Sequence, residues 1–175
     1  MSSQPKSVCV LFADVSGSTR LYEKLGDAEA LRAVERCLNR MRRVVDGHGG
    51  KVIKTIGDEV MTTFPNADAG IQAACEMQHR VTDLPPVSGV KLAIRVGFHF
   101  GPAIEENDDV FGDTVNTAAR MAGLAKAGQI ITTAETLAAV TLSMGPEVRE
   151  IDALTVKGKT EDVRVCEVLW QEGAD

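Results

Sequence analysis

The segment KVIKTIGDEVMTTF, at residues 51–64, limits the possible folds of this chain more than any other part of the sequence. Two runs rich in strand-forming residues flank the dipeptide Gly57-Asp58. β-Branched and aromatic residues favour strands, and a Gly-Asp pair between two such runs favours a tight turn. We therefore expect an antiparallel hairpin with a carboxylate at its tip.

Other segments also have the patterns of strands. Residues 8–13 form a short apolar run that ends at Asp14, as in a buried strand. Side chains in the run KLAIRVGFHF alternate between the two faces of a strand. Arg95, Gly97 and His99 lie on one face. Its other face is apolar and carries Leu92, Ile94, Val96, Phe98 and Phe100. Further strands are expected at QIITT and around Thr155 and Val165.

A long helical pattern covers about 27–48 and ends at Gly49-Gly50. Its apolar face carries Leu31, Val34, Leu38, Met41 and Val45. Its opposite face carries Arg32, Arg36, Arg40 and Arg43, a stripe that suits a solvated face better than a docking surface. Further helices are expected over about 67–81, 114–125 and 135–140. Helices mixed with hairpins predict one α+β domain over residues 1–175, with a core over about 7–170 and a largely antiparallel sheet.

The composition argues against several classes of protein. Asp and Glu number 25 and Lys and Arg 19, a net charge of −6, so we expect no nucleic-acid partner. No run approaches the roughly 20 apolar residues of a membrane span, and we expect no direct membrane contact. The four cysteines lack metal-binding or CxxC spacing, which favours core packing in a reducing, cytoplasmic environment.

Two carboxylates stand where they could carry chemistry. Asp14 ends a buried strand just before a polar turn, and Asp58 stands at the tip of the hairpin. Strand ends and hairpin tips can converge on one edge of a sheet, and carboxylate oxygens suit Mg²⁺ together with substrate phosphates. Taken singly, each residue is also explained as a helix cap or a Gly-Asp turn.

The loop SGST, at the start of a predicted helix, supplies backbone N–H groups of a kind that bind phosphate. It consists of Ser16, Gly17, Ser18 and Thr19. A Gly-Ser turn without any ligand has the same pattern, so the loop gains meaning only from its place beside Asp14.

Other polar residues could hold a nucleotide. Asn116 and Arg120 share one helix face, where an amide and a guanidinium suit a ribose oxygen and a phosphate. An exposed pair without function is equally compatible with that spacing. Lys157, in LTVKGKT, lies either in a phosphate-binding loop or in a plain hairpin turn. Arg95 needs a carboxylate, a phosphate or solvent.

Five segments together resemble the class III adenylyl and guanylyl cyclase catalytic domain. They are FADVSGST, KVIKTIGDEVMTTF, IRVGFHFG, DDVFGDTVNTAARM and LTVKGKT, in the family's order from Val10 to about Lys159. The resemblance implies a ferredoxin-like, palm-type sheet flanked by helices. It also implies an adenylate cyclase, which converts ATP to 3′,5′-cyclic AMP and pyrophosphate with two Mg²⁺ or Mn²⁺ ions per active site.

The resemblance also implies roles for single residues. Asp14 and Asp58 match the metal ligands, with the carbonyl of Val15 as a further one. Lys54 matches the lysine that donates to adenine N1, and Asp109 the aspartate that accepts from the exocyclic amine. The remaining matches are Asn116 and Arg120 for the transition state, and Lys157 and Arg95 for the phosphates.

In the family two such domains pair head to tail, and each active site takes residues from both. The full set is present here, so the resemblance implies a homodimer that needs no other chain, although a regulatory domain or partner outside this sequence is compatible with it. Between HFG and DVFGD the chain has only PAIEEND, which resembles the bacterial subclass with a shortened dimer arm.

Three other functions are alternatives to an adenylate cyclase. A guanylate cyclase would need the reverse polarity at Lys54 and Asp109. A non-catalytic nucleotide-binding or regulatory module would be expected to lack a metal aspartate, Asn116 or Arg120. A diguanylate cyclase would need Gly-Gly before the Asp-Glu of the hairpin, where this chain has Ile56-Gly57.

Overall fold

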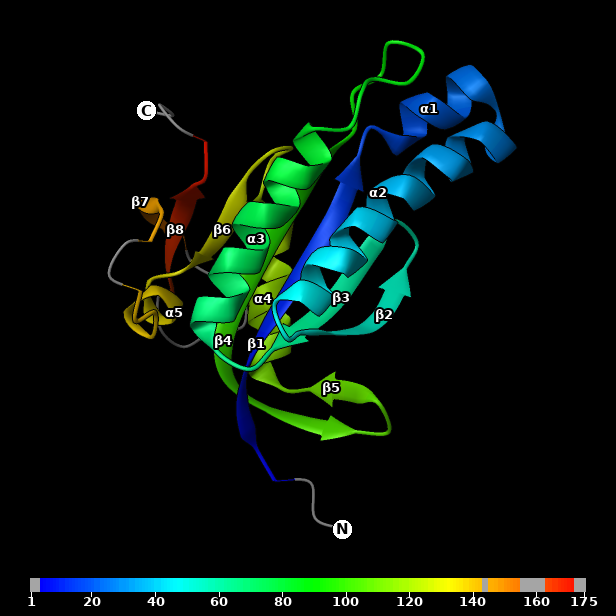
Figure 1. Cartoon of the computed structure of the whole chain (residues 1–175). Helices are drawn as coiled ribbons and strands as arrows, with labels where there is room; N and C mark the ends of the chain where they lie inside the picture. Colours follow the sequence, from blue (N-terminus) through cyan, green and yellow to red (C-terminus); the bar gives the residue numbers. More distant parts are fainter. Residues whose placement is uncertain (1–3, 143–144, 155–162, 172–175) are drawn as a thin grey trace.

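One sheet organises the chain (Figure 1). The computed structural model describes residues 4–142, 145–154 and 163–171. Within them the strand order is β2-β3-β1-β4-β6-β8-β7, and β5 pairs with β4. The strands are β1 (Lys6–Ser16), β2 (Lys51–Ile56), β3 (Glu59–Phe64), β4 (Ala93–Glu106), β5 (Asp109–Phe111), β6 (Ile130–Thr133), β7 (Glu147–Leu154) and β8 (Val163–Leu169).

The strand pairing is antiparallel throughout the described residues, except between β4 and β6, which run parallel. This confirms the expected α+β class and the largely antiparallel sheet. The hairpin of β2 and β3 forms around Gly57, whose φ of +60° is readily available to glycine. Asp58 therefore stands at the hairpin tip, as the sequence predicts.

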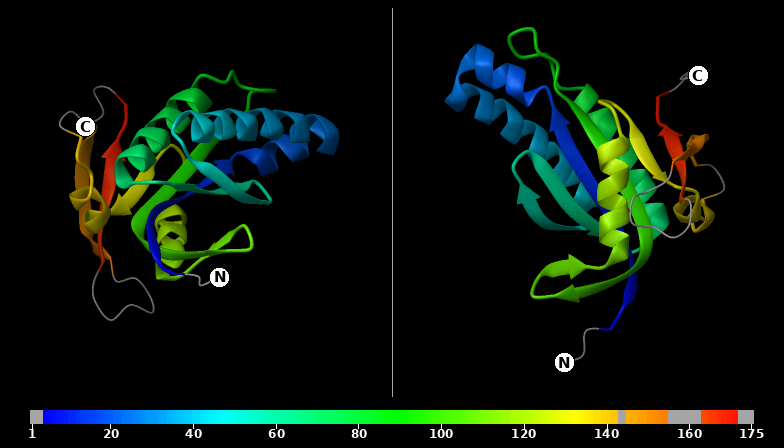
Figure 2. Two further views of the ribbon diagram at one scale, coloured as in Figure 1. Left: turned by 60° about the horizontal axis from the view of Figure 1, so that its bottom comes forward. Right: turned by 180° about the vertical axis from the view of Figure 1, so that it is seen from behind.

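Helices cover both faces of the sheet (Figures 1 and 2). They are α1 (Ser18–Leu25), α2 (Asp27–Gly47), α3 (Ala67–Thr82), α4 (Asp113–Leu124) and α5 (Ala134–Ala138). The alternation of β1 shows the two layers: Leu11 and Ala13 join the apolar cluster of α2 and α3, whereas Val10 and Phe12 join that of α4. Because side chains alternate along a strand, Asp14 shares the face of Phe12.

The helix predicted over 27–48 is present as α2, but one of its assigned core residues was wrong. Leu31 is 50% exposed. The buried line of the helix runs instead through Ala30, Val34, Cys37 and Met41. Leu31 is displaced from that line because each residue turns the helix by about 100°.

Two short elements escaped the sequence prediction. Residues 18–25 form the separate helix α1, which ends where Gly26 takes a φ of +80°. The three-residue strand β5 is too short to show a periodic pattern. Of the two expected C-terminal strands, β7 ends at Leu154, and Thr155 lies outside the described residues.

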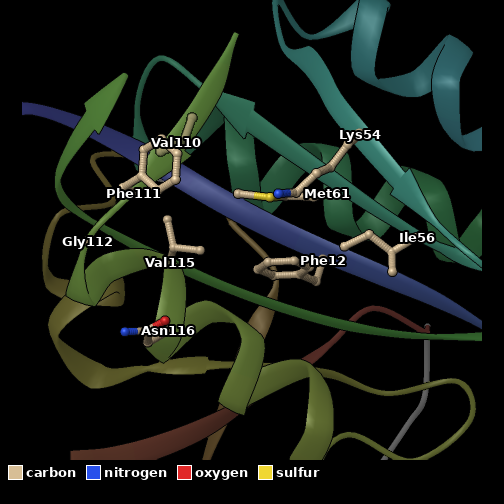
Figure 3. A pocket seen from close by; sticks show the side chains of 9 residues that line it. All are labelled: Phe12, Lys54, Ile56, Met61, Val110, Phe111, Gly112, Val115 and Asn116. Atoms are coloured by element: carbon tan, nitrogen blue, oxygen red, sulfur yellow. The ribbon is translucent and has the colours of Figure 1, made fainter. Parts of the chain in front are cut away.

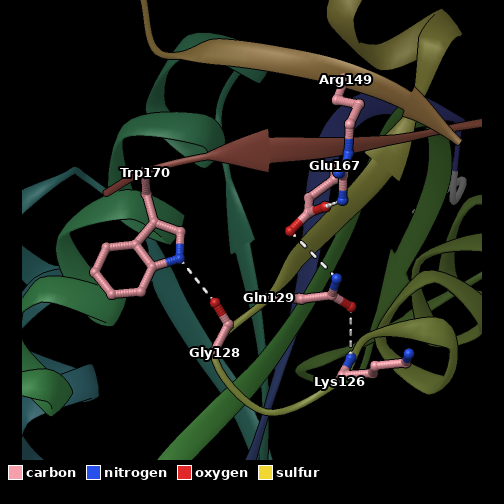
Figure 4. A network of polar contacts seen from close by, with 6 residues as sticks. All are labelled: Lys126, Gly128, Gln129, Arg149, Glu167 and Trp170. Carbon is pink, nitrogen blue, oxygen red and sulfur yellow. Dashed lines mark hydrogen bonds and ion pairs between the residues drawn. The ribbon is translucent and has the colours of Figure 1, made fainter. Parts of the chain in front are cut away.

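Polar contacts join the C-terminal hairpin to the loop after α4 (Figure 4). The carboxylate of Glu167 accepts hydrogen bonds from Gln129, at 3.2 Å, and from Arg149 of β7. The indole N–H of Trp170 donates to the carbonyl of Gly128 at 2.8 Å. These contacts fix β8 and β7 against the segment that leads out of α4. None of the described helices is long and apolar enough to cross a membrane.

Candidate active site

A carboxylate-rich edge forms where β1 meets the tip of the β2–β3 hairpin. The backbone N–H of Val15 donates to the carbonyl of Asp58 at 3.1 Å, which fixes the hairpin tip beside the end of β1. Asp14 lies opposite Glu59 of β3 and Arg95 of β4 in the strand register. The structure thus brings Asp14 and Asp58 to the same edge, as the sequence predicts.

The charges at this edge are only partly compensated. Burial raises the pKa of Asp14, the Arg95 guanidinium opposes that shift, and the negative charge of Asp58 adds to it. Burial likewise raises the pKa of Glu59, and the charge of Asp14 adds to this. The Arg95 guanidinium is 4.0 Å from the Asp14 carboxylate, too far for a short ion pair. Carboxylates in this arrangement are suited to a divalent cation.

The protein itself offers few ligands there. Among the described residues, no group of three or more His, Cys, Asp or Glu side chains is placed to hold a metal ion. Mg²⁺ is commonly held by one or two carboxylates together with water and substrate phosphates, so two aspartates fit that mode of binding. A closed, all-protein zinc site would need more ligands.

The SGST segment begins two residues after Asp14, where β1 ends and α1 begins. Gly17 takes a φ of +96° at the N-cap of α1, and Ser18 is buried while Thr19 is exposed. The hydroxyl of Ser16 accepts a hydrogen bond from Arg95 Nε at 3.2 Å. The loop, Arg95 and Asp14 therefore lie together at one end of β1.

Lys54 and Asp109 form a second group. The Lys54 ammonium is 2.9 Å from the Asp109 carboxylate, which joins β2 to β5. This hydrogen bond, with another from the Val110 N–H, holds the pKa of Asp109 below its usual range. The contact confirms that two residues 55 positions apart in the sequence come together.

A pocket of about 270 Å³ lies beside this pair, on the α4 face of the sheet. Its lining consists of Phe12, Lys54, Ile56, Met61, Val110, Phe111, Gly112, Val115 and Asn116. Figure 3 shows Phe12, Met61 and Val115 around one space between the sheet and α4. An apolar slot with an ion pair at its rim can take a flat, polar-edged ring.

The helix α4 brings in the remaining predicted pair. Asn116 lines the pocket, and Arg120 is exposed one turn farther along the same helix. Lys157 lies outside the described residues. No hydrogen bond or ion pair between described residues joins the Asp14 edge to Lys54, Asp109 or Asn116. The predicted residues thus fall into two groups within one chain.

Sequence reasoning missed the apolar lining and one acid. Glu59, opposite Asp14, was not singled out, although its place directly after Asp58 could have drawn attention to it. The period of two along a strand could have found two more: Ile56 follows Lys54 on one face, and Phe12 precedes Asp14 on another. Phe111 gave no such signal, because β5 was not expected.

Comparison with known proteins identifies the family. The family model described as "Adenylate and Guanylate cyclase catalytic domain" matches residues 1–167. The terminal-differentiation specific adenylate cyclase of Dictyostelium discoideum is 32% identical, over 97% of this chain and 9% of its own length. An adenylate cyclase of Streptomyces coelicolor is 33% identical, over 69% of this chain and 30% of its own length.

Solved structures show the same fold. The crystal structure of the adenylyl cyclase CyaB from P. aeruginosa is 24% identical and has a TM-score of 0.82, with 97% of this chain and 96% of that chain covered. The present chain spans less than a third of the length of either named relative. The match over residues 1–167 and the shared fold show that the chain belongs to the family of adenylate and guanylate cyclase catalytic domains.

Proposed function

We propose that this domain is an adenylate cyclase, which forms 3′,5′-cyclic AMP and pyrophosphate from ATP between two copies of the chain. The observation that carries the proposal is the Lys54–Asp109 pair, at 2.9 Å, beside an apolar pocket. Family membership favours the cyclisation of a nucleoside triphosphate, and the Lys54–Asp109 pair bears on which base is bound.

The polarity of the pair favours adenine. The edge of adenine offers an acceptor at N1 and a donor at its exocyclic amine, which match the Lys54 ammonium and the Asp109 carboxylate. Guanine presents a donor at N1 and an acceptor at O6, so the same two side chains would meet it with the wrong polarity. A buried donor or acceptor without a partner loses more binding free energy than a formed hydrogen bond contributes. The mismatch with guanine should therefore make the pair strongly selective for adenine.

The carboxylate edge would hold the metal ions. Asp14 and Asp58, with the carbonyl of Val15, supply hard oxygen ligands, and the neighbouring negative charges of the two aspartates favour a cation there. When bound, Mg²⁺ or Mn²⁺ supplies Lewis acidity toward the ribose 3′-hydroxyl and neutralises phosphate charge.

The other predicted residues would orient and stabilise the nucleotide. Asn116 holds the ribose, and Arg120 binds the α-phosphate, whose charge grows in the transition state. The phosphates are bound by Lys157, Arg95 and the backbone of residues 16–19. The 3′-oxygen bonds to the α-phosphorus as the bond to the bridging oxygen breaks. The hydroxyl proton goes to solvent, and pyrophosphate leaves.

A homodimer would complete the site. The metal-binding edge and the base-reading pair are separate groups within one chain, so two copies placed head to tail could each supply one group to a shared site. Ile56 and Phe111, both about half exposed beside the pocket, are large apolar residues that such an interface would cover.

Turnover assays on the purified chain with ATP or GTP and Mn²⁺, over a range of protein concentrations, test the substrate and the assembly together. We expect cyclic AMP from ATP, with a specific activity that rises with protein concentration and is abolished in Asp58→Ala. Cyclic GMP as the main product would make the chain a guanylate cyclase. A folded dimer that forms neither product would indicate a regulatory module.

Mixing two inactive variants tests the shared site directly. Asp58→Ala removes one half of the site, and Arg120→Ala removes the other. In a mixed dimer one of the two sites would be intact, so random pairing of equal amounts should restore about a quarter of wild-type activity. No recovery in a mixture that exchanges subunits would place each complete site within a single chain.

A further inference from the structure

A second cavity lies on the opposite side of the molecule from the nucleotide pocket. It occupies about 500 Å³ between the outer sides of α2 and α3, whereas the pocket beside Lys54 lies on the α4 face. Figure 1 shows the two helices side by side. The lining consists of Arg40, Arg43, Val44, Gly47, His48, Glu76 and Arg80. None of these residues belongs to the proposed active site.

Positive charge concentrates in this cavity. Three arginines line it against the single carboxylate of Glu76, a local charge of +2 in a chain whose net charge is −6. That carboxylate is shared between two long contacts, 3.7 Å from His48 and 3.6 Å from Arg80. One acid with two distant partners leaves most of the guanidinium N–H groups available to another acceptor.

Structural roles explain only some of the three arginines that line the cavity. Arg40 donates to the carbonyl of Arg80 at 3.3 Å, which satisfies one carbonyl at the end of α3. Arg80 stands in the last turn of α3, where a cation complements the helix dipole. Arg43 makes no hydrogen bond or ion pair with any described residue. Arg43 is exposed, so its guanidinium N–H groups in the cavity wall are available to a ligand.

The neighbouring surface suggests how large a ligand could be. A wider hollow of about 670 Å³ shares three lining residues with the cavity, His48, Glu76 and Arg80. Its far side carries Trp170, Leu142 and Pro146, and His79 meets the Trp170 ring edge-on, with 5.0 Å between the ring centroids. A phosphate in the basic cavity could therefore be followed by an aromatic or apolar group against Trp170.

We propose that the cavity between α2 and α3 is a second ligand site, which binds the phosphate group of a small soluble molecule. Guanidinium groups match the paired oxygens of a phosphate, and a concave site of this volume is typical of small-molecule binding. The site is independent of the nucleotide pocket. Its ligand would contact Gly47, the last residue of α2, and His48, just before the segment that leads into β2 and Lys54.

Histidine NMR in EDTA, with pyrophosphate as the probe, tests the proposal apart from catalysis. The chain has only three histidines. His48 and His79 line the two hollows, whereas His99 is buried in the sheet and hydrogen-bonded to Thr133. We expect pyrophosphate to shift the His48 and His79 signals saturably and to leave His99 unmoved. Shifts of none of them, or of His99 alone, would overturn the proposal.

Two matched variants identify the arginines responsible. Arg40→Gln/Arg43→Gln should weaken binding at least tenfold, because charge-assisted hydrogen bonds are lost. Arg32→Gln/Arg36→Gln removes the same charge from exposed positions of the same helix outside the cavity and should change the affinity less than twofold. Loss of Arg40 could weaken the fold, because Arg40 bonds the carbonyl of Arg80. The single variant Arg43→Gln removes no hydrogen bond or ion pair between described residues, so weaker pyrophosphate binding by this variant would report on the site itself. Equal weakening by both double variants would mean general charge attraction and overturn the proposal.

Two further binding experiments distinguish a small phosphate ligand from a membrane surface and from an acidic protein segment. We expect vesicles that contain phosphatidic acid, and a polyglutamate peptide, to leave the His48 signal in place at matched charge concentration. If vesicles or peptide bind through Arg43 and pyrophosphate does not, the cavity is part of a membrane-binding or protein-binding surface. The proposal of a small-molecule site would then be wrong. A folded wild-type dimer that forms no cyclic nucleotide but still binds pyrophosphate in this cavity would remove the proposed function and leave this inference standing.

Discussion

Gly97 of β4 lies directly under Ala122 of α4, and a Cβ atom added to Gly97 would be 1.9 Å from the Ala122 backbone nitrogen. No side chain fits in that space. The absence of one lets α4 lie against the sheet, and this close packing places Asn116 at the edge of the pocket beside Lys54. The distance between helix and sheet is therefore set by a residue that takes no part in binding.

Gly97→Ala should destabilise the protein and lower turnover. The obstacle is helix backbone, which cannot move aside as a side chain could, so α4 must shift as a whole. Overpacking of this kind typically costs about 1–3 kcal/mol of unfolding free energy. Gly123→Ala is the control, because an added methyl there meets nothing within 4 Å and helix propensity should stabilise by roughly 0.5–1 kcal/mol. Urea unfolding of both variants checks this; equal stabilities would contradict it.

Lys54→Gln should lower kcat/KM for ATP by about one to two orders of magnitude, since a charged hydrogen bond is worth about 1.5–3 kcal/mol. Lys51→Gln is the matched control. Lys51 stands three residues earlier in β2 and pairs with Asp108 at 3.8 Å, but it does not line the pocket. Its loss should leave kcat/KM unchanged.

The double variant Lys54→Glu/Asp109→Cys reverses the polarity of the base-reading pair. We expect its ratio of cyclic GMP to cyclic AMP, measured with equal GTP and ATP, to rise above that of the wild type. A ratio that stays constant, in a variant that still turns over ATP, would mean that base selection resides elsewhere.

The contact between Asp68 and Thr141 should make stability depend on pH. Asp68, in the first turn of α3, accepts hydrogen bonds from the backbone N–H of Thr141, at 2.7 Å, and from its hydroxyl. These bonds lower the pKa of Asp68. A carboxyl whose pKa is lower in the folded state stabilises above its unfolded pKa of about 3.9, and the contribution is lost as pH falls through the folded value.

Asp68→Asn should therefore lower the Tm at pH 7, and its difference from the wild type should shrink as the pH falls below about 4. Glu105→Gln removes an exposed carboxylate that has no ion pair or hydrogen bond with another described residue, and it should change the Tm little at either pH. Thermal unfolding at pH 7 and pH 3 compares the two variants. A Tm difference for Asp68→Asn that is unchanged by pH would rule out the carboxylate as its source.

Two arginines of the C-terminal hairpin should differ in importance. Arg149 donates to Glu167, whose side chain is only 12% exposed, whereas Arg164 pairs with Glu150, which is 49% exposed. Arg149→Met leaves a nearly buried carboxylate with Gln129 as its remaining observed partner, and should cost about 1.5–3 kcal/mol. Arg164→Met should cost much less, as for other pairs at the protein surface. Similar losses in urea unfolding would contradict the role of burial.

Local patterns in the sequence predicted much of the fold. The alternation of KLAIRVGFHF fixed which residues of β4 face α2 and α3, because the period of a strand is two. The turn at Gly57-Asp58 fixed the hairpin tip, since few residues other than glycine take a positive φ readily. The prediction that Leu31 is buried was wrong, because an apolar residue on a helix is buried only if another part of the protein packs over it.

The candidate site was predicted in part. Asp14 and Asp58 were recognised from their places at a strand end and a hairpin tip, and the backbone bond from Val15 to Asp58 brings them to one edge. The walls of the pocket beside Lys54 could not be listed in advance. Phe111 joins it through β5, whose pairing with β4 depends on contacts between segments and not on a local period.

The sequence by itself determined the family, the helices and strands with long periodic patterns, and the candidate residues proposed to bind metal and base. These properties reside in side-chain chemistry and short-range spacing. Only the tertiary structure decided that Lys54 meets Asp109, that Gly97 admits α4, and that Arg40, Arg43 and Arg80 share a cavity. Each of these depends on the packing of elements far apart in the chain, and no local spacing specifies the distance between two packed surfaces.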